Sequence, residues 1–317
     1  MTDIVVINPG EIQNSGGGDF DIEELIRRFL ADQDIRQKSK DAYRNSLIQY
    51  FDWIRKKGFL ISNVTRAEIL IYKEELMASD KSKLTVGAYT NSVRRFYEWA
   101  EAVKLYPNVA KGIRAPKRKN AFKKESLLPD QVKLLLDYFK NKSLRDFAII
   151  NLIVRCGLRT IEVSRLRVGD IVFKSGARIL MIHGKGKDEK DDFVLLTEKS
   201  YLPIKEYLAS RKDIKDSSPI FISQSTNGTM GNPIDPKYIS GIAKEGLVAI
   251  GLDGKQYTAH SLRHTTASGL LRSGATMDAI QAVLRHASPA TTQIYTASAK
   301  DENRILNKTE SMLDDLF

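Results

Sequence analysis

The chain has 317 residues, 42% of them hydrophobic and 28% charged, a composition that is ordinary for a soluble globular protein long enough to form two domains. Its single cysteine, Cys156, excludes an intramolecular disulfide framework and a CxxC metal site, and its longest apolar run, residues 147–154, is too short to cross a bilayer. The net charge of +11 suits a polyanionic partner, although binding to a ribosome or to a membrane surface explains such a charge equally well.

Residues 1–19 are predicted to be a flexible N-terminal lead. They contain Pro9-Gly10 and three consecutive glycines at 16–18. No basic residue precedes the apolar run at 4–7, so the lead lacks the pattern of a secretory signal. We therefore expect a cytoplasmic protein.

Residues 20–110 are predicted to form a small all-α domain. Four segments repeat apolar residues at helical spacing, the first of them directly after Asp21. Thr65 and Glu68 form the capping-box pattern that opens the third helix, and the fourth helix is predicted to begin near Thr85.

Residues 111–124 are predicted to be a basic linker. This stretch holds seven basic residues and no acidic one, and Pro116 prevents it from being helical throughout. We interpret the linker as a segment that lies across phosphate groups, with a merely solvated tether as the alternative.

Residues 125–300 are predicted to form a second, mostly helical domain with a small antiparallel three-stranded sheet, so the fold class of the whole chain is mainly α. Ile161, Val163 and Leu166 are expected to pack a short helix after Arg159. The other predicted helices are 129–140, 143–156, 199–212, 237–249, 258–271 and 276–284, and the predicted strands are 170–173, 178–183 and 192–197.

Residues suited to proton transfer and phosphate binding gather late in the chain. Three of the four histidines lie between residues 258 and 286. His260 and Arg263 are three residues apart and share one face near a helix N-terminus, a position that binds anions. His286 is followed nine residues later by Tyr295. This concentration indicates a reaction centre.

Earlier in the chain, Arg159 follows a Gly-Leu pair, Glu162 lies three residues further on, and Lys185 occupies a Gly-Lys-Gly turn between two predicted strands. Together with residues 260–295, these motifs resemble the signature of the tyrosine site-specific recombinases, which include phage integrases and Xer-type recombinases. The predicted domain order fits that family over the whole chain. One departure is Arg285, where family members usually have glycine. Because it precedes the active histidine, we expect this arginine to be tolerated and to face DNA.

The resemblance implies an enzyme that cleaves and rejoins DNA through a 3′-phosphotyrosine intermediate and a Holliday junction, without metal, ATP or any other cofactor. Tyr295 is then expected to be the nucleophile. Arg159 and Arg263 are expected to bind the non-bridging phosphate oxygens through their planar guanidinium groups.

Four further roles are expected from the same resemblance. His286 is expected to add a hydrogen bond to the phosphate, and Lys185 to protonate the 5′ leaving oxygen. His260 is expected to manage the proton of the tyrosine. Glu162 is expected to support Arg159 or His260 without taking a direct part.

The resemblance also implies partners. One partner is double-stranded DNA with an inverted-repeat core site. The others are further copies of the chain, which form a dimer on one site and a tetramer in the synapse. The need for a second recombinase or an accessory protein stays open, and no membrane is expected. Residues 301–317 have the spacing of an amphipathic helix. The resemblance implies that this helix docks on a neighbouring protomer, and folding back on its own domain is the alternative. The residues expected to contact DNA are Arg44, Arg94, Arg95, Arg114, Lys117, Arg118 and Lys119.

Three other functions are compatible with parts of this pattern. A type IB topoisomerase uses similar tyrosine chemistry. A zinc hydrolase would use His260 and His264, which are four residues apart, although Ser261 occupies the place of the glutamate that such sites have. A non-catalytic DNA-binding regulator would need only the basic charge. We interpret His264 and His183 as structural histidines.

Overall fold

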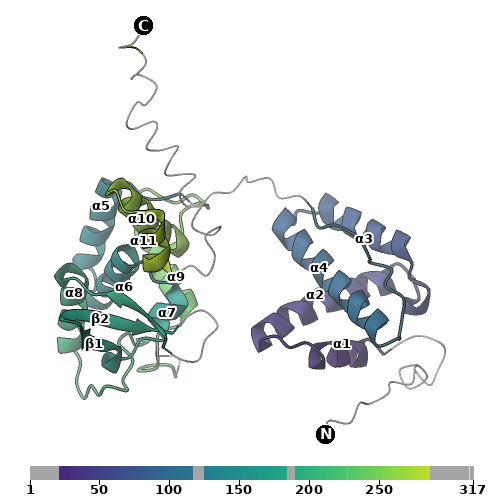
Figure 1. Cartoon of the computed structure of the whole chain (residues 1–317), viewed down its shortest axis with the longest axis horizontal. Coiled ribbons are helices and arrows are strands. Elements are labelled where there is room, and N and C mark those ends of the chain that lie inside the picture. Colours follow the sequence, from purple (N-terminus) through teal and green to yellow (C-terminus); the bar gives the residue numbers. More distant parts are fainter. Residues whose placement is uncertain (1–20, 117–124, 184–189, 227, 286–313, 315–317) are drawn as a thin grey trace. The chain divides into compact units, whose positions relative to one another are not determined.

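The computed structural model describes residues 21–116, 125–183, 190–226, 228–285 and 314. The chain divides into two compact units, Met1–Ala121 and Phe122–Phe317, and each is considered by itself (Figure 1). Helices dominate both units, and the described strands form one small sheet in the second, so the predicted mainly α fold class is confirmed. No helix within the described ranges has both the length and the apolar character needed to cross a membrane.

The first unit contains the four predicted helices. Glu68 Oε2 accepts a hydrogen bond from the Thr65 backbone N–H at 2.7 Å, which confirms the capping box. Ser82 Oγ accepts from the Thr85 backbone N–H at 3.1 Å, so the fourth helix begins slightly earlier than predicted. The helices are α1 (Ile22–Ala31), α2 (Gln37–Lys56), α3 (Arg66–Ala78) and α4 (Lys83–Ala102), with a 3-10 turn at Ile61–Asn63.

The core of the first unit is rich in aromatic rings. Phe29 is fully buried and meets the rings of Phe96 and Trp99 edge-on, with centroids 5.8 Å apart in both pairs. Ile113 also belongs to this core, and Arg66 donates a hydrogen bond to the Lys111 carbonyl. The folded part of the unit therefore continues into the first residues of the stretch expected to be a linker.

The second unit combines seven helices, a 3-10 turn and the sheet in its described residues. The helices are α5 (Pro129–Lys140), α6 (Leu144–Cys156), α7 (Thr160–Ser164), α8 (Glu198–Ala209), α9 (Pro236–Ala249), α10 (Ala259–Arg272) and α11 (Met277–Leu284), and the 3-10 turn is Val168–Asp170. The strands are β1 (Ile171–Lys174), β2 (Ala177–Ile182) and β3 (Asp192–Leu195).

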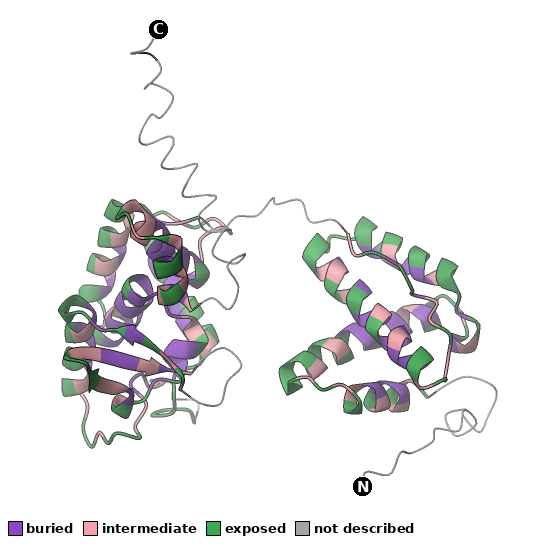
Figure 2. Ribbon diagram, in the orientation of Figure 1, coloured by how far each residue is buried: buried purple, intermediate pink, exposed green. Residues whose placement is uncertain are grey.

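Helix α6 lies at the centre of this unit. Ten of its thirteen residues are buried, and it contacts α5, α8 and α10 (Figure 2). A helix that is buried on nearly all sides needs apolar residues around its whole circumference, and the run from Ala148 to Val154 meets that need apart from Asn151. The C-terminal end of α6 is therefore a rigid base for the turn that follows it.

The sheet is antiparallel, with β2 between β1 and β3. The predicted strands are confirmed, with ends that differ by one or two residues. The expectation for Ile161 is wrong. Its side chain is exposed, because α7 is a single short turn that buries only Glu162, Val163 and Ser164.

Candidate active site

The turn after α6 shapes the candidate site. Gly157 has φ +61°, in the left-handed region that favours glycine, and its N–H donates to the Ile153 carbonyl at 2.9 Å. A Cβ atom at this position would lie 2.6 Å from Leu284 Cδ2 and 3.4 Å from Thr266 Cγ2. Glycine is thus required both by the backbone conformation and by the close approach of α10 and α11.

The turn places Arg159 at the N-cap position of α7, beside Glu162. Glu162 Oε2 accepts from the Arg159 backbone N–H at 2.8 Å, and Oε1 accepts from Arg159 Nη1 at 2.6 Å. The carboxylate is buried, whereas the Arg159 side chain is 25% exposed. Glu162 therefore caps the helix and orients the guanidinium at once, and the expected contact between these two residues is present.

Arg263 lies beneath the same turn. It is 1% exposed and projects from α10, where its Nη1 donates to the Gly157 carbonyl and its Nη2 to the Leu284 carbonyl. These charge-assisted bonds connect the end of α6 to the end of α11. In this arrangement the guanidinium holds the backbone at Gly157 and Leu284 together.

Arg285 joins this cluster, although it was expected to face DNA. That expectation is wrong, because its side chain is only 3% exposed and points inward. Nη2 lies 2.8 Å from Glu162 Oε2, and Nη1 donates to the Val283 carbonyl at 2.7 Å. The physical reason is that a buried carboxylate needs compensating positive charge, and Arg285 supplies it.

The pKa of Glu162 reflects these surroundings. Burial raises the pKa of the carboxyl, but the charge of Arg285 and then the backbone N–H and charge of Arg159 outweigh burial, so the pKa lies below its usual range. The carboxylate is therefore ionised at neutral pH.

His260 lies on the first turn of α10, one turn of helix from His264. The predicted start of this helix is confirmed, with the Thr258 N–H donating to Ser261 Oγ at 3.0 Å. The His260 side chain is exposed, whereas His264 is buried and its ring meets that of His260 edge-on, with centroids 5.4 Å apart. His260 is thus the more accessible of the two imidazoles.

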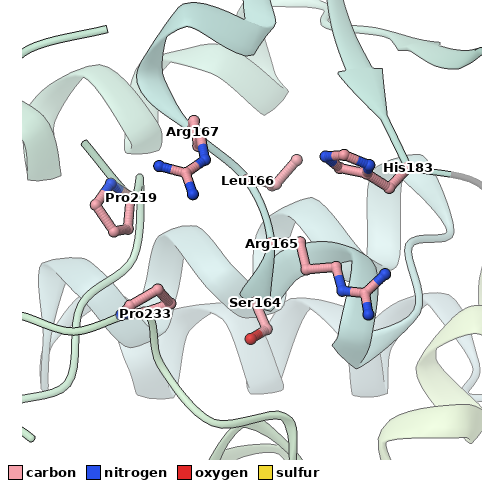
Figure 3. Close-up of a pocket in the computed structure, with 7 residues that line it drawn as sticks. All are labelled: Ser164, Arg165, Leu166, Arg167, His183, Pro219 and Pro233. Atoms are coloured by element: carbon pink, nitrogen blue, oxygen red, sulfur yellow. The ribbon is translucent and has the colours of Figure 1, made fainter. Parts of the chain in front are cut away.

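A hollow of about 320 Å³ lies beside α7 and the end of β2 (Figure 3). His183 lines one side of it, and Arg165 and Arg167 contribute exposed guanidinium side chains. The Arg167 N–H donates to Asp170 Oδ2 at 2.8 Å, and the same buried carboxylate binds Lys190. Lys190 thereby ties the β2–β3 connection to the 3-10 turn, a contact that the sequence did not suggest.

Comparison with known proteins places the chain in a family. Residues 125–302, more than half of the chain, match the family model described as "Phage integrase family", and residues 22–104 match "Phage integrase, N-terminal SAM-like domain". The chain belongs to the phage integrase family of tyrosine recombinases. Enzymes of this family cleave and rejoin DNA, which confirms the resemblance seen in the motifs.

Two relatives illustrate the match. The recombinase is 29% identical over 283 residues to tyrosine recombinase XerC of Chromobacterium violaceum, covering 87% of this chain and 90% of that protein. It is 31% identical over 267 residues to XerC of Thermodesulfovibrio yellowstonii, covering 80% and 84%. These names do not favour the topoisomerase alternative.

Solved structures share the fold. A XerH recombinase in a post-cleavage complex with its palindromic difH substrate matches with a TM-score of 0.74 at 19% identity, covering 96% of this chain and 92% of that one. A lambda integrase dimer bound to a COC′ core site matches with a TM-score of 0.68 at 17% identity, covering 86% and 76%. At these identities the likeness concerns the fold alone.

In the first unit, the recombinase presents basic residues on α2 and α4. Arg44 and Arg95 are exposed and Arg94 is half-buried. Arg94 and Arg95 lie 3.5 Å and 3.6 Å from Glu98, distances typical of weak surface pairs. A groove of about 470 Å³ is lined by Tyr43, Asn91, Arg94, Arg95 and Glu98.

The structure brings together Arg159, Glu162 and Arg263 from the predicted set, and it adds Arg285. The only sequence signal for Arg285 was an arginine in place of glycine directly after the last residue of α11. Arg114 is exposed at the end of the first unit's described residues. Six other predicted residues, Lys117, Arg118, Lys119, Lys185, His286 and Tyr295, lie outside the described residues, as does the predicted C-terminal helix 301–317 apart from residue 314.

The zinc alternative gains no third ligand. Across the described ranges, no three His, Cys, Asp or Glu side chains gather in an arrangement that could hold a metal ion. The Cys156 thiol is buried at the end of α6, and burial raises its pKa, which agrees with an inert structural cysteine.

Proposed function

We propose that this recombinase acts on specific DNA sites in the cytoplasm, cleaving one strand with Tyr295 and rejoining it through a 3′-phosphotyrosine intermediate and a Holliday junction, without metal or ATP. The observation that carries the proposal is the arginine cluster around Gly157, in which Glu162 orients Arg159 and Arg263 supports the turn. Such a preorganised group of cations matches the charge that develops on a phosphorane.

Arg159 is the arginine best placed to meet the phosphate. Its Nη1 is held by Glu162, while its Nε and Nη2 make no hydrogen bond to the residues that the structure describes. Because the side chain is partly exposed, these two N–H groups can donate to non-bridging oxygens as a planar pair. The bond to Glu162 fixes the plane before substrate arrives.

Arg263 contributes in a different way. Its guanidinium donates to two backbone carbonyls, one of them on Leu284, two residues before His286. We infer that Arg263 holds the chain leading to His286 and adds positive charge behind the phosphate.

The remaining roles complete the proposal. Lys185 protonates the 5′ leaving oxygen, His286 donates to the phosphate, and His260 manages the proton of Tyr295. The DNA has an inverted-repeat core site, bound by a dimer, and two such sites form a tetrameric synapse in which residues 301–317 dock on the neighbouring protomer. Phosphate contacts outside the centre come from Arg44, Arg94, Arg95, Arg114, Lys117, Arg118 and Lys119.

The decisive experiment uses a nicked suicide substrate, which traps the covalent protein–DNA adduct. Tyr295→Phe should still bind the DNA but form no adduct, because phenylalanine has no nucleophilic oxygen. Tyr138→Phe is the matched control, since the Tyr138 hydroxyl binds Glu245 between α5 and α9 and should leave adduct formation unchanged. An adduct that persists in Tyr295→Phe would place the nucleophile elsewhere.

A further inference from the structure

Arg285 occupies a backbone position that does not suit it. Its φ is +53°, in the left-handed region where residues other than glycine are strained. Its side chain is almost completely buried, and its Nε makes no hydrogen bond to any residue that the structure describes. A buried guanidinium in strained backbone is unfavourable by itself, so its contacts have to offset the cost.

The charged partner of Arg285 is Glu162. The carboxylate is divided between two arginines, with Oε1 bound to Arg159 Nη1 at 2.6 Å and Oε2 bound to Arg285 Nη2 at 2.8 Å. Oε2 also accepts the Arg159 backbone N–H. The Glu162 side chain is thereby held by both arginines and cannot rotate without breaking a charge-assisted bond.

The same arginine connects to Arg263. Arg285 Nη2 lies 3.4 Å from the Gly157 carbonyl oxygen, which also accepts from Arg263 Nη1, and Arg263 Nη2 binds the carbonyl of the preceding residue, Leu284. Arg159, Arg263 and Arg285 therefore form one network through Glu162 and Gly157. This network contains three guanidinium groups and one carboxylate, so it has a net positive charge that suits a phosphate diester.

We propose that Arg285 is a positioning residue for DNA cleavage, which orients the Arg159 guanidinium by holding Glu162 in place. The inference rests on the proposed cleavage function. Arg285 stands at the position where family members usually have glycine, so this role is additional to those of the predicted catalytic residues. Arg285 itself does not touch the phosphate in this scheme.

The arrangement also predicts a pH effect. The charged groups that face Glu162 are Arg159 at the start of its own helix and Arg285 at the end of α11, while Arg263 reaches the adjacent Gly157 carbonyl from α10. The carboxyl has a depressed pKa, so its hold on Arg159 is present at neutral pH and is lost as the pH falls through that value. Without Arg285, the effect of burial on the Glu162 carboxyl is opposed less strongly, so its pKa rises. The ion pair between Glu162 and Arg159 is then lost at a higher pH.

The test measures single-turnover cleavage of the suicide substrate by the full-length protein, at saturating protein and across a range of pH. Arg285→Gly removes the guanidinium and fits the left-handed backbone, so it should fold, and Arg285→Lys keeps a charge but loses the planar fork. Arg285→Gly should cleave roughly 10-fold to 100-fold more slowly, a loss typical of residues that orient a reacting group from behind. The acid limb of its pH–rate profile should move to higher pH, while its DNA affinity stays nearly unchanged. The cleavage rate and the acid limb of Arg285→Lys should lie between those of Arg285→Gly and the unmodified protein.

Arg145→Lys is the matched control. Arg145 is another buried arginine of the second unit, 3% exposed and 2.8 Å from Asp146, and it donates to the Ile222 carbonyl. This substitution keeps the charge but removes the planar fork, and it perturbs a buried ion pair in the same unit without touching Glu162. Cleavage by Arg145→Lys should keep the rate and the pH profile of the unmodified protein.

Glu162→Gln tests the route of the effect. If Arg285 acts through Glu162, the double variant Arg285→Gly with Glu162→Gln should cleave no more slowly than Glu162→Gln alone. The inference would be overturned if the double variant lost cleavage rate by the product of the two single losses. It would also be overturned if Arg285→Gly kept the rate and the pH profile of the unmodified protein. A failure of the proposed function looks different, because then the unmodified protein forms no adduct or Tyr295→Phe still forms one.

Discussion

Replacing Gly157 with alanine tests whether the turn after α6 is as tightly packed as the structure indicates. The added Cβ faces two costs. A left-handed conformation in a residue other than glycine costs about 1–2 kcal/mol, and an atom 2.6 Å from Leu284 Cδ2 forces the neighbour to move. Leu284 is fully buried against Ile280, so its side chain cannot turn away freely, and such overpacking costs about 1–3 kcal/mol.

Together the two effects predict that Gly157→Ala lowers the free energy of unfolding of the second unit by roughly 2–5 kcal/mol. Gly176→Ala is the matched control. Gly176 also has a positive φ, +77°, but nothing lies within 4 Å of its Cβ position, so only the backbone cost of about 1–2 kcal/mol applies. In a domain of this size each kcal/mol lowers Tm by about 2–4 °C, which makes the difference measurable.

The assay is calorimetric unfolding of the full-length protein, combined with tryptophan fluorescence. Both tryptophans, Trp53 and Trp99, lie in the first unit, so their fluorescence should report a transition that neither substitution moves. The calorimetric transition of the second unit should fall further for Gly157→Ala than for Gly176→Ala. On a Leu284→Ala background, which removes the clashing atom, the extra cost of Gly157→Ala should shrink. Equal costs for the two glycines on the normal background would refute the reasoning.

Three further predictions concern the reaction. Arg159→Ala and Arg263→Ala should each slow cleavage about 10²-fold to 10³-fold with a much smaller loss of DNA binding, and chelators should have no effect; cleavage that stops in EDTA and returns with zinc or magnesium would contradict the metal-free mechanism. A bridging 5′-phosphorothiolate needs no proton to leave, so it should restore cleavage to Lys185→Ala but not to Arg159→Ala, and equal rescue of both would mean that the acid is another group. Deleting residues 301–317 should leave single-site binding intact and abolish synapsis, which native gel shifts can follow; normal recombination by the truncated protein would show that another segment connects the protomers.

The sequence by itself determined the helices and the first half of the site, because these depend on near neighbours. Thr65 and Glu68 cap one helix, and Thr276 caps α11 by accepting from the Ala279 N–H. Arg159 and Glu162 are three residues apart, so their contact also follows from local helix geometry. Such interactions form wherever the segment folds, and the pattern of residues is sufficient to predict them.

Only the tertiary structure decided where the buried charges point. Arg285 and Glu162 are separated by 123 positions in the chain, and Arg263 reaches a carbonyl 106 positions away. Nothing near Arg285 in the sequence distinguishes a side chain that faces DNA from one that turns inward, since exposed and buried arginines look alike in a local pattern. Around Gly157, α6, α10 and α11 pack closely, and the Glu162 carboxylate beside this turn is buried. Because a buried carboxylate is stable only when it is paired with a cation, Arg285 turns inward to pair with it.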